Sequence, residues 1–318
     1  MRQRGTGAGI ALALVSALGF GTSGAIATGL LDAGWSPAAA VTARAAIAAL
    51  LLAVPASIAM RGRWRLLLTG WRTVLLFGVM AVGLTQLAYF QAVQHVSVGV
   101  ALLLEYLGVL LVVLWLWLRH GQRPRPLSIA GGVVALVGLV GVLDLASGAS
   151  VNPLGVIWGL VAALGLAIYF VTSADDRTPI PPVALAAAGL LTGAVTLGLV
   201  GAVGILPMRF TAADVTLAGQ WLPWWALVGA LALISTAVAY STGIGAARVL
   251  GSKVASFVGL TEVLFAVLIA WALLGQLPRP IQLVGGVLIL VGVIAVKADE
   301  RSPLSDIGIE PEPHPDRD

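Results

Sequence analysis

Three charged side chains, Arg44, Glu105 and Glu262, lie well inside long apolar stretches of the sequence. A charge near the centre of a bilayer costs about 2.5–3.5 kcal/mol on insertion scales when it faces lipid unpaired. We therefore expect all three to face a helix-bundle interior, a water-filled cavity or each other. Carboxylates in such a cavity could bind a cationic or zwitterionic molecule or carry a proton. The alternative is that Arg44 only neutralises one acid in a structural ion pair.

Uncharged polar side chains in the same apolar stretches are weaker candidates for the site. They are Gln86, Tyr89 and Gln91 in the third stretch, Tyr106 directly after Glu105, and Tyr240 in the eighth. Tyr89 and Tyr240 each follow an alanine and occupy corresponding places in the two halves of the chain. Lining a cavity and hydrogen bonding between helices both suit these side chains, and the sequence leaves the two open.

The chain has few residues of the types that catalyse reactions or bind cofactors. Cysteine is absent, and histidine occurs only at positions 95, 120 and 314. The stretch Gly19–Gly24 fits a GxGxxG pattern, but it lies in an apolar segment with no preceding strand, which argues against nucleotide binding. We predict no catalytic residues, no cofactor and no metal site, and so not an enzyme.

The composition is that of an integral membrane protein, since 59% of residues are hydrophobic and only 10% are charged. Ten stretches are long and apolar enough to be candidate spans. They cover residues 8–31, 36–58, 72–93, 97–118, 127–145, 153–172, 182–205, 223–243, 254–275 and 281–297. The predicted fold is all-α with ten transmembrane helices.

The distribution of basic residues orients these spans. With a cytoplasmic N-terminus and ten spans, 15 of the 18 Lys and Arg residues fall on the inner side and only Arg209 and Arg279 fall outside. This is the bias of the positive-inside rule, so no nucleic-acid partner is needed to explain the basic pI. The long outer connection 206–222 is predicted to lie along the interface as a short amphipathic piece. The acidic, proline-rich residues 299–318 are predicted to form a disordered cytoplasmic tail.

An internal repeat divides the chain. Gly121-Gln122-Arg123-Pro124-Arg125-Pro126 recurs 154 residues later as Gly275-Gln276-Leu277-Pro278-Arg279-Pro280. At the same offset Gly131, Gly132 and Gly138 become Gly285, Gly286 and Gly292. Two repeats of five spans, residues 1–148 and 149–298, must enter the membrane from opposite sides. The sequence thus predicts two inverted five-helix repeats with a site between them.

An ordered set of motifs resembles the EamA family of the drug/metabolite transporter superfamily. The set comprises Ala43–Ala48 in span two, Ala88–Ala92 at the end of span three, Leu260–Leu264 in span nine and Leu273–Gln276 after it. The chain departs from the family pattern where Gln122 and Gln276 replace a glutamate. The resemblance implies a carrier in the bacterial inner membrane with both termini cytoplasmic, and a cavity lined by spans three, four, eight and nine.

These observations predict a secondary active transporter that works by alternating access. The resemblance implies export of small organic metabolites such as amino acids, and a proton is the simplest coupling ion for two buried acids. A passive channel and a membrane-embedded or lipid-handling enzyme are the alternatives. The expected partners are a small-molecule substrate, the lipid bilayer and protons. The oligomeric state is left open, although a monomer would suffice.

Overall fold

The structure is a computed structural model that describes residues 2–96, 98–121, 124–142, 152–175, 177, 179–217, 219–274 and 279–298. The predicted tail, residues 299–318, lies outside the described residues.

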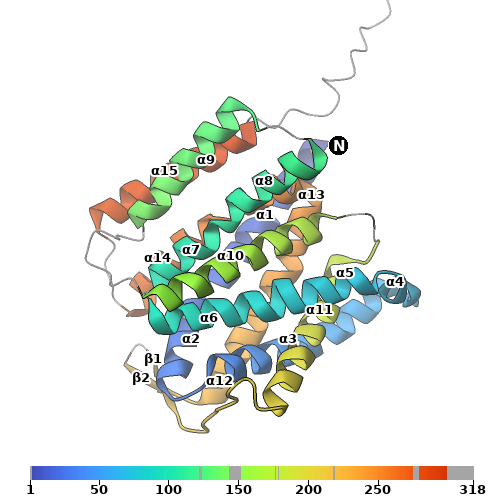
Figure 1. The fold of residues 1–318 in the computed structure, drawn as a ribbon, viewed down its shortest axis with the longest axis vertical. Coiled ribbons are helices and arrows are strands. Elements are labelled where there is room, and N and C mark those ends of the chain that lie inside the picture. Colours follow the sequence, from blue (N-terminus) through green and yellow to red (C-terminus); the bar gives the residue numbers. More distant parts are fainter. Residues whose placement is uncertain are drawn as a thin grey trace, which may run out of the picture.

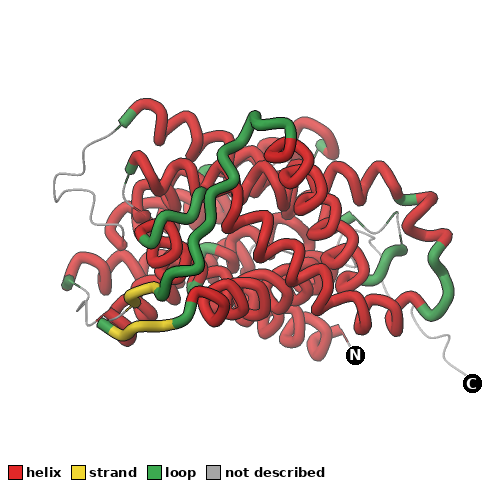
Figure 2. The backbone as a smooth tube through the Cα atoms, turned by 90° about the horizontal axis from the view of Figure 1, so that it is seen from below, coloured by secondary structure: helices red, strands yellow, loops and turns green. Residues whose placement is uncertain are grey.

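Helices make up nearly all of the described chain, and the two short strands lie together at one end of the molecule (Figure 2). The first half contains α1 (Arg2–Gly21), α2 (Ser23–Asp32), α3 (Pro37–Met60), α4 (Arg65–Thr69), α5 (Trp71–Leu76), the π-helix η1 (Phe77–Leu84), α6 (Thr85–His95), α7 (Val98–Tyr106), α8 (Gly108–His120) and α9 (Pro126–Val142). The second half contains α10 (Pro153–Ala174), α11 (Pro182–Ala202), β1 (Val215–Leu217), β2 (Gln220–Leu222), α12 (Trp224–Ala232), the π-helix η3 (Leu233–Val238), α13 (Ala239–Gly259), α14 (Thr261–Leu274) and α15 (Pro280–Ala298).

Eight helical segments of the described chain are long and apolar enough to cross a membrane, fewer than the ten predicted spans. Two local features account for the difference. The segment Trp224–Gly259 is 36 residues long because it runs through Gly251, whose φ of 77° and ψ of 162° are not helical. The predicted boundary between spans eight and nine falls in this region. The helix at 126–141 is apolar but shorter than the other segments.

The connection 206–222 contains secondary structure that the sequence did not predict, and its position along the interface stays a prediction. Its second part forms a β-hairpin in which Val215 pairs with Leu222 and Leu217 pairs with Gln220. Gly219 adopts a φ of 73°, a left-handed conformation that suits glycine in a tight turn. The buried Val215 packs near Gly29 of α2, so the hairpin covers the end of that helix.

Two π-helical segments interrupt corresponding helices of the two halves. In η1–α6 the Thr85 hydroxyl donates to the Met80 carbonyl at 2.7 Å. In η3 the Thr236 hydroxyl donates to the Leu231 carbonyl at 2.8 Å. The donors are 151 residues apart, as are the acceptors, and this is also the separation of Tyr89 and Tyr240. Such π-segments often mark functional positions in helices.

Three further breaks divide apolar stretches that the sequence predicts as continuous helices. α1 gives way to α2 at Thr22, α7 to α8 at Leu107, and α13 to α14 at Leu260. The Thr22 hydroxyl lies 2.6 Å from that of Ser235 in η3, so the first break is bonded to a π-segment of the other half. Backbone groups released at such breaks are tolerated in a membrane protein where they meet other protein groups or water.

The packing joins elements far apart in the sequence. α9 and α15 lie side by side along one edge of the bundle, and Figure 1 shows them as a pair. α10 packs against α6, α7 and α8, while α1 packs against α13 and α14. α11 packs against α3. The first half is therefore not an independent body, because each half supplies helices to the packing of the other.

Candidate functional site

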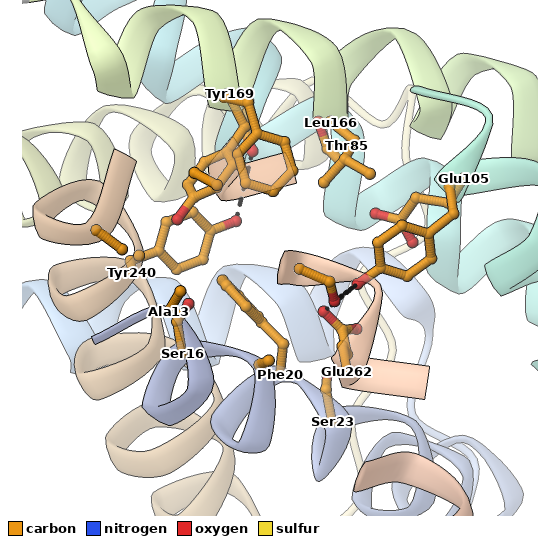
Figure 3. Close-up of a pocket in the computed structure, with 18 of the residues that line it drawn as sticks. Ala13, Ser16, Phe20, Ser23, Thr85, Glu105, Leu166, Tyr169, Tyr240 and Glu262 are labelled. Atoms are coloured by element: carbon orange, nitrogen blue, oxygen red, sulfur yellow. Dashed lines mark hydrogen bonds between the residues drawn. The ribbon is translucent and has the colours of Figure 1, made fainter. Parts of the chain in front are cut away.

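A cavity lies where the broken and π-helical segments meet (Figure 3). Its lining comes from α1, α2, η1, α6 and α7 in the first half and from α10, α13 and α14 in the second. All four tyrosines of the chain line it, namely Tyr89, Tyr106, Tyr169 and Tyr240. Both of the predicted acids, Glu105 and Glu262, line it as well.

Glu105 lies in the last turn of α7 and is only 7% exposed. Its carboxylate has no hydrogen-bond partner within the described part of the chain. The C-terminal end of a helix carries partial negative charge, which disfavours a second negative charge there. Glu105 therefore faces the cavity as an acid without a hydrogen-bond partner among the described residues, and Arg44 is the positive charge that interacts with it.

Glu262 has the opposite environment. It lies in the first turn of α14, where the partial positive charge of the helix end favours a carboxylate. The Tyr106 hydroxyl lies 2.8 Å from Glu262 Oε2 and 2.9 Å from the Gly259 carbonyl oxygen. Tyr106 thus links the break after α7 to the break between α13 and α14.

The hydrogen count in this cluster depends on the state of Glu262. When its carboxyl is ionised, the single phenolic hydrogen of Tyr106 faces two acceptors, because both the carboxylate and the Gly259 carbonyl only accept. When the carboxyl is protonated, it donates to the phenol oxygen and Tyr106 donates to Gly259. The described geometry suits both states, and they differ in how strongly Tyr106 holds the α13–α14 break.

Arg44 lies beside the cavity rather than in its lining. It is 1% exposed on α3 and donates to Ser23 Oγ at 2.9 Å and to Gln86 Oε1. Its guanidinium also lies over the Phe90 ring, 4.8 Å from the centroid. Among the described residues no ion pair joins Arg44 to Glu105 or Glu262. The structural ion pair considered from the sequence is not formed, and neutral partners hold the guanidinium instead.

The far end of the cavity is aromatic. The Tyr240 ring centroid lies 5.0 Å from that of Phe20 and 5.6 Å from that of Tyr169, in edge-to-face arrangements. Phe20 and Tyr169 are 6.3 Å apart. In Figure 3 Tyr169 and Tyr240 lie on one side of the cavity and Glu105 on the other, with Phe20 and Glu262 below and between them. The cavity has an aromatic end and an acidic end.

The structure brings most of the predicted site residues together. Glu105, Glu262, Tyr106, Gln86, Tyr89 and Tyr240 line the cavity. Gln91 is partly buried on α6 but is not part of the lining, and Arg44 acts through Ser23 and Gln86. Spans three, four, eight and nine were the predicted lining, and α1, α2 and α10 contribute to it in addition.

Most of the lining residues that the sequence did not predict come from these added helices, and Thr85 lies on α6. They are Ser16, Phe20, Ser23, Thr85, Tyr169 and Phe170 among the polar and aromatic side chains. Tyr169 could have been found from the sequence, because the other three of the four tyrosines were candidate site residues. Phe20 and Ser23 fall in the GxGxxG-like stretch, where Gly21 serves packing. A Cβ on Gly21 would lie 3.0 Å from the Glu262 carbonyl oxygen.

Comparison with known proteins assigns the family. The sequence model of the EamA-like transporter family matches residues 7–144 and, separately, residues 153–297. The chain belongs to the EamA-like transporter family. A relative from Archaeoglobus fulgidus, described as an uncharacterized transporter, is 30% identical over 211 residues, covering 66% of this chain and 71% of the relative. A solved crystal structure matches with a TM-score of 0.72 at 20% identity, covering 90% of this chain and 95% of that one.

These findings confirm the predicted family and a multi-pass membrane transporter, and the solved structure supports the fold alone. Within the described residues of this EamA-like transporter, no cluster of three histidine or acidic side chains could hold a metal ion. The polar side chains that line the cavity are the two acids, four tyrosines, Ser16, Ser23, Thr85 and the Gln86 amide.

Proposed function

We propose that this EamA-like transporter is a secondary active carrier that exports small organic metabolites, such as amino acids, by alternating access coupled to protons. The observation that carries the proposal is the origin of the cavity lining, which both halves of the chain supply. A site shared by two repeats can be exposed to either side of the membrane when one repeat rocks against the other. The cytoplasmic membrane of a bacterium, with both termini inside, is the proposed location.

Ten spans in two inverted repeats, residues 1–148 and 149–298, are part of this proposal. The separate family matches to residues 7–144 and 153–297 support the division. The contacts between α9 and α15 support an inverted relation. A Cβ on Gly131 would lie 2.8 Å from the Gly292 carbonyl oxygen, and one on Gly138 would lie 2.6 Å from that of Gly285. Repeat-related glycines therefore pair crosswise along antiparallel helices, as a two-fold axis requires.

Proton coupling is supported by the two acids and by the hydrogen count at Tyr106. Protonation of Glu262 supplies the second hydrogen that the Tyr106, Glu262 and Gly259 oxygens need to be bonded at the same time. A proton that binds there changes how the helix break is held. This is the kind of differential interaction that lets a bound ion shift a conformational equilibrium.

Transport by the purified protein in proteoliposomes tests the proposal. A carrier gives saturable uptake and counterflow, whereas a channel gives linear flux, and flux of no metabolite in a broad panel would contradict the carrier. For coupling, Glu105→Gln and Glu262→Gln are compared with Asp32→Asn, an exposed acid at the end of α2. We expect the loss of pH-driven accumulation with retained counterflow in at least one cavity variant and no change in the control. Normal accumulation in both cavity variants would exclude coupling through these acids.

A further inference from the structure

We infer that the cavity binds an organic cation, with an ammonium head at Glu105 and an apolar or aromatic body against Phe20, Tyr169 and Tyr240. The inference rests on the proposed transport function and narrows its substrate class from small organic metabolites to amines, in place of the amino acids given there as an example. It follows from three features of the described residues. These are an acid without a hydrogen-bond partner, an arginine that already has partners of its own, and an aromatic surface at the opposite end of the same cavity.

The first feature is Glu105. The side chain is only 7% exposed, faces the cavity and has no hydrogen-bond partner among the described residues. It also lies at the C-terminal end of α7, where the partial negative charge of the helix favours cations. Carboxylate and helix end thus attract the same kind of ligand, a positive charge that can donate hydrogen bonds. A protonated amine meets both requirements.

The second feature is the charge balance around the acids. The ionisable side chains facing Glu105 and Glu262 are Arg44 on α3, Tyr89 on α6, Tyr106 on α7, Tyr169 on α10 and Tyr240 on α13. Arg44 is the single cation of this set, and Ser23, Gln86 and Phe90 hold it beside the cavity. No basic side chain belongs to the described lining. Two carboxylates and one guanidinium leave one negative charge for a bound cation or a proton.

The same balance argues against a substrate carboxylate. An amino acid would bring its carboxylate into a lining that offers acids, hydroxyls and amides but no lysine, arginine or histidine. The cost of desolvating that second charge would have no compensating partner. An amine without a carboxylate avoids the cost, so the cavity chemistry favours a cation over a zwitterion.

The third feature is the aromatic end. Phe20, Tyr169 and Tyr240 pack edge to face with centroid separations of 5.0–6.3 Å, and in Figure 3 Tyr169 and Tyr240 lie across the cavity from Glu105. Aromatic surfaces bind apolar groups and also attract cations to their faces. A molecule with a charged head and an aromatic body matches both ends of the cavity at once.

Three molecules with one skeleton test the inference. Phenethylammonium carries the head and the body, phenylalanine adds a carboxylate, and 2-phenylethanol replaces the amine with an uncharged hydroxyl. Binding to the purified full-length transporter is measured by calorimetry at neutral pH. We expect phenethylammonium to bind with the highest affinity of the three. Equal or tighter binding of phenylalanine or 2-phenylethanol, or no binding of phenethylammonium, would overturn the inference.

Variants at both ends assign the contacts. Glu105→Gln is expected to weaken phenethylammonium binding on the order of 100-fold because a charge-paired contact in a low-dielectric site is lost. Glu105→Asp, which keeps the charge, is expected to retain most of the affinity, and Asp32→Asn all of it. Tyr169→Leu is expected to weaken phenethylammonium more than ethylammonium, which lacks the ring. Unchanged phenethylammonium affinity in a folded Glu105→Gln variant would overturn the assignment of the head.

Counterflow in proteoliposomes separates this inference from the proposed function. If an anion, a zwitterion or a neutral molecule shows saturable counterflow while organic cations show none, the protein is a carrier and the cation inference is wrong. If no molecule of any class shows counterflow, the carrier proposal itself fails.

Discussion

The cavity and the α9–α15 pair are both built from the two halves of the chain, yet their helices differ in kind. α9 and α15 are continuous and apolar, and glycines bring their backbones into close contact. The helices around the cavity are broken at Thr22, Leu107 and Leu260 and carry the π-segments η1 and η3. Regular helices satisfy the hydrogen bonds of their own backbone, so their contact depends only on how well their surfaces pack together. Broken helices release polar groups, and these gather where the acids and tyrosines already lie.

This difference leads to an expectation about which helices move during transport. The α9–α15 contact relies on close packing, which tolerates little movement because a shift of one ångström opens a void or a clash. The cavity relies on hydrogen bonds between helix breaks, such as that of Tyr106 to Gly259. Hydrogen bonds of this kind can be exchanged for others at small net cost. We therefore expect the cavity helices to move and the α9–α15 pair to move as a unit.

The largest effect is expected at Arg44, which tests how far the cavity depends on a fixed polar network. Arg44→Lys keeps the charge but loses the planar fork that reaches both Ser23 and Gln86. Removing one partner from a buried charged network costs about 3 kcal/mol. We expect a clear fall in the midpoint of thermal unfolding in detergent, and none for Arg65→Lys, which replaces an exposed residue of α4. Equal midpoints would mean that Arg44 is not structural.

A smaller but still large effect is expected at the α9–α15 contact. Gly292→Ala would place a Cβ 2.7 Å from the Ala135 backbone nitrogen, so the helices must separate. Overpacking of this kind costs about 1–3 kcal/mol. Gly229→Ala in α12 meets nothing within 4 Å and should stabilise by up to about 1 kcal/mol through helix propensity. Thermal unfolding of both variants therefore gives shifts of opposite sign if close contact, and not glycine content, holds the pair together.

Tyr106→Phe tests the hydrogen bonds at the cavity. The variant keeps the ring but loses the bonds to Gly259 and Glu262, so the α13–α14 break is held less firmly. A single hydrogen bond contributes about 1 kcal/mol, which corresponds to roughly a fivefold change in an equilibrium. We expect altered transport kinetics with little loss of stability, and a smaller change for Tyr240→Phe, whose hydroxyl donates to Ala81 over 3.4 Å. Unchanged kinetics in Tyr106→Phe would show that this bond does not control the break.

The smallest effect is expected at Asp175, which lies between α10 and α11 outside both regions. Hydrogen bonds from Arg177, at 2.6 Å for the closest pair, lower the pKa of the Asp175 carboxyl. A lowered pKa stabilises the folded state above the unfolded pKa of about 3.9 and loses that contribution as the pH falls through the folded value. Arg177 is exposed and Asp175 is only partly buried, so Asp175→Asn should cost less than about 1 kcal/mol at neutral pH and nothing in strong acid. Thermal unfolding of both proteins, from strong acid to neutral pH, measures this contribution to stability.

Much of this protein follows from its sequence, because a bilayer restricts the choice of structure. Long apolar stretches must be helices, isolated charges within them must face inward, and basic residues orient the loops. Those rules alone point to Glu105 and Glu262 as cavity residues. The repeat of glycines at a fixed offset likewise indicates two related halves, and the family matches to residues 7–144 and 153–297 agree with it.

Only the tertiary structure decided what these residues do for one another. The sequence presents Glu105 and Glu262 as similar acids, yet one ends a helix without a partner and the other begins a helix and is bonded to Tyr106. Helix breaks at Thr22, Leu107 and Leu260 carry no strong signal of their own, since each depends on groups supplied by a distant segment. The sequence did not predict that Phe20 and Tyr169 line the cavity, because a contact between helices from different halves is a property of packing and not of local sequence.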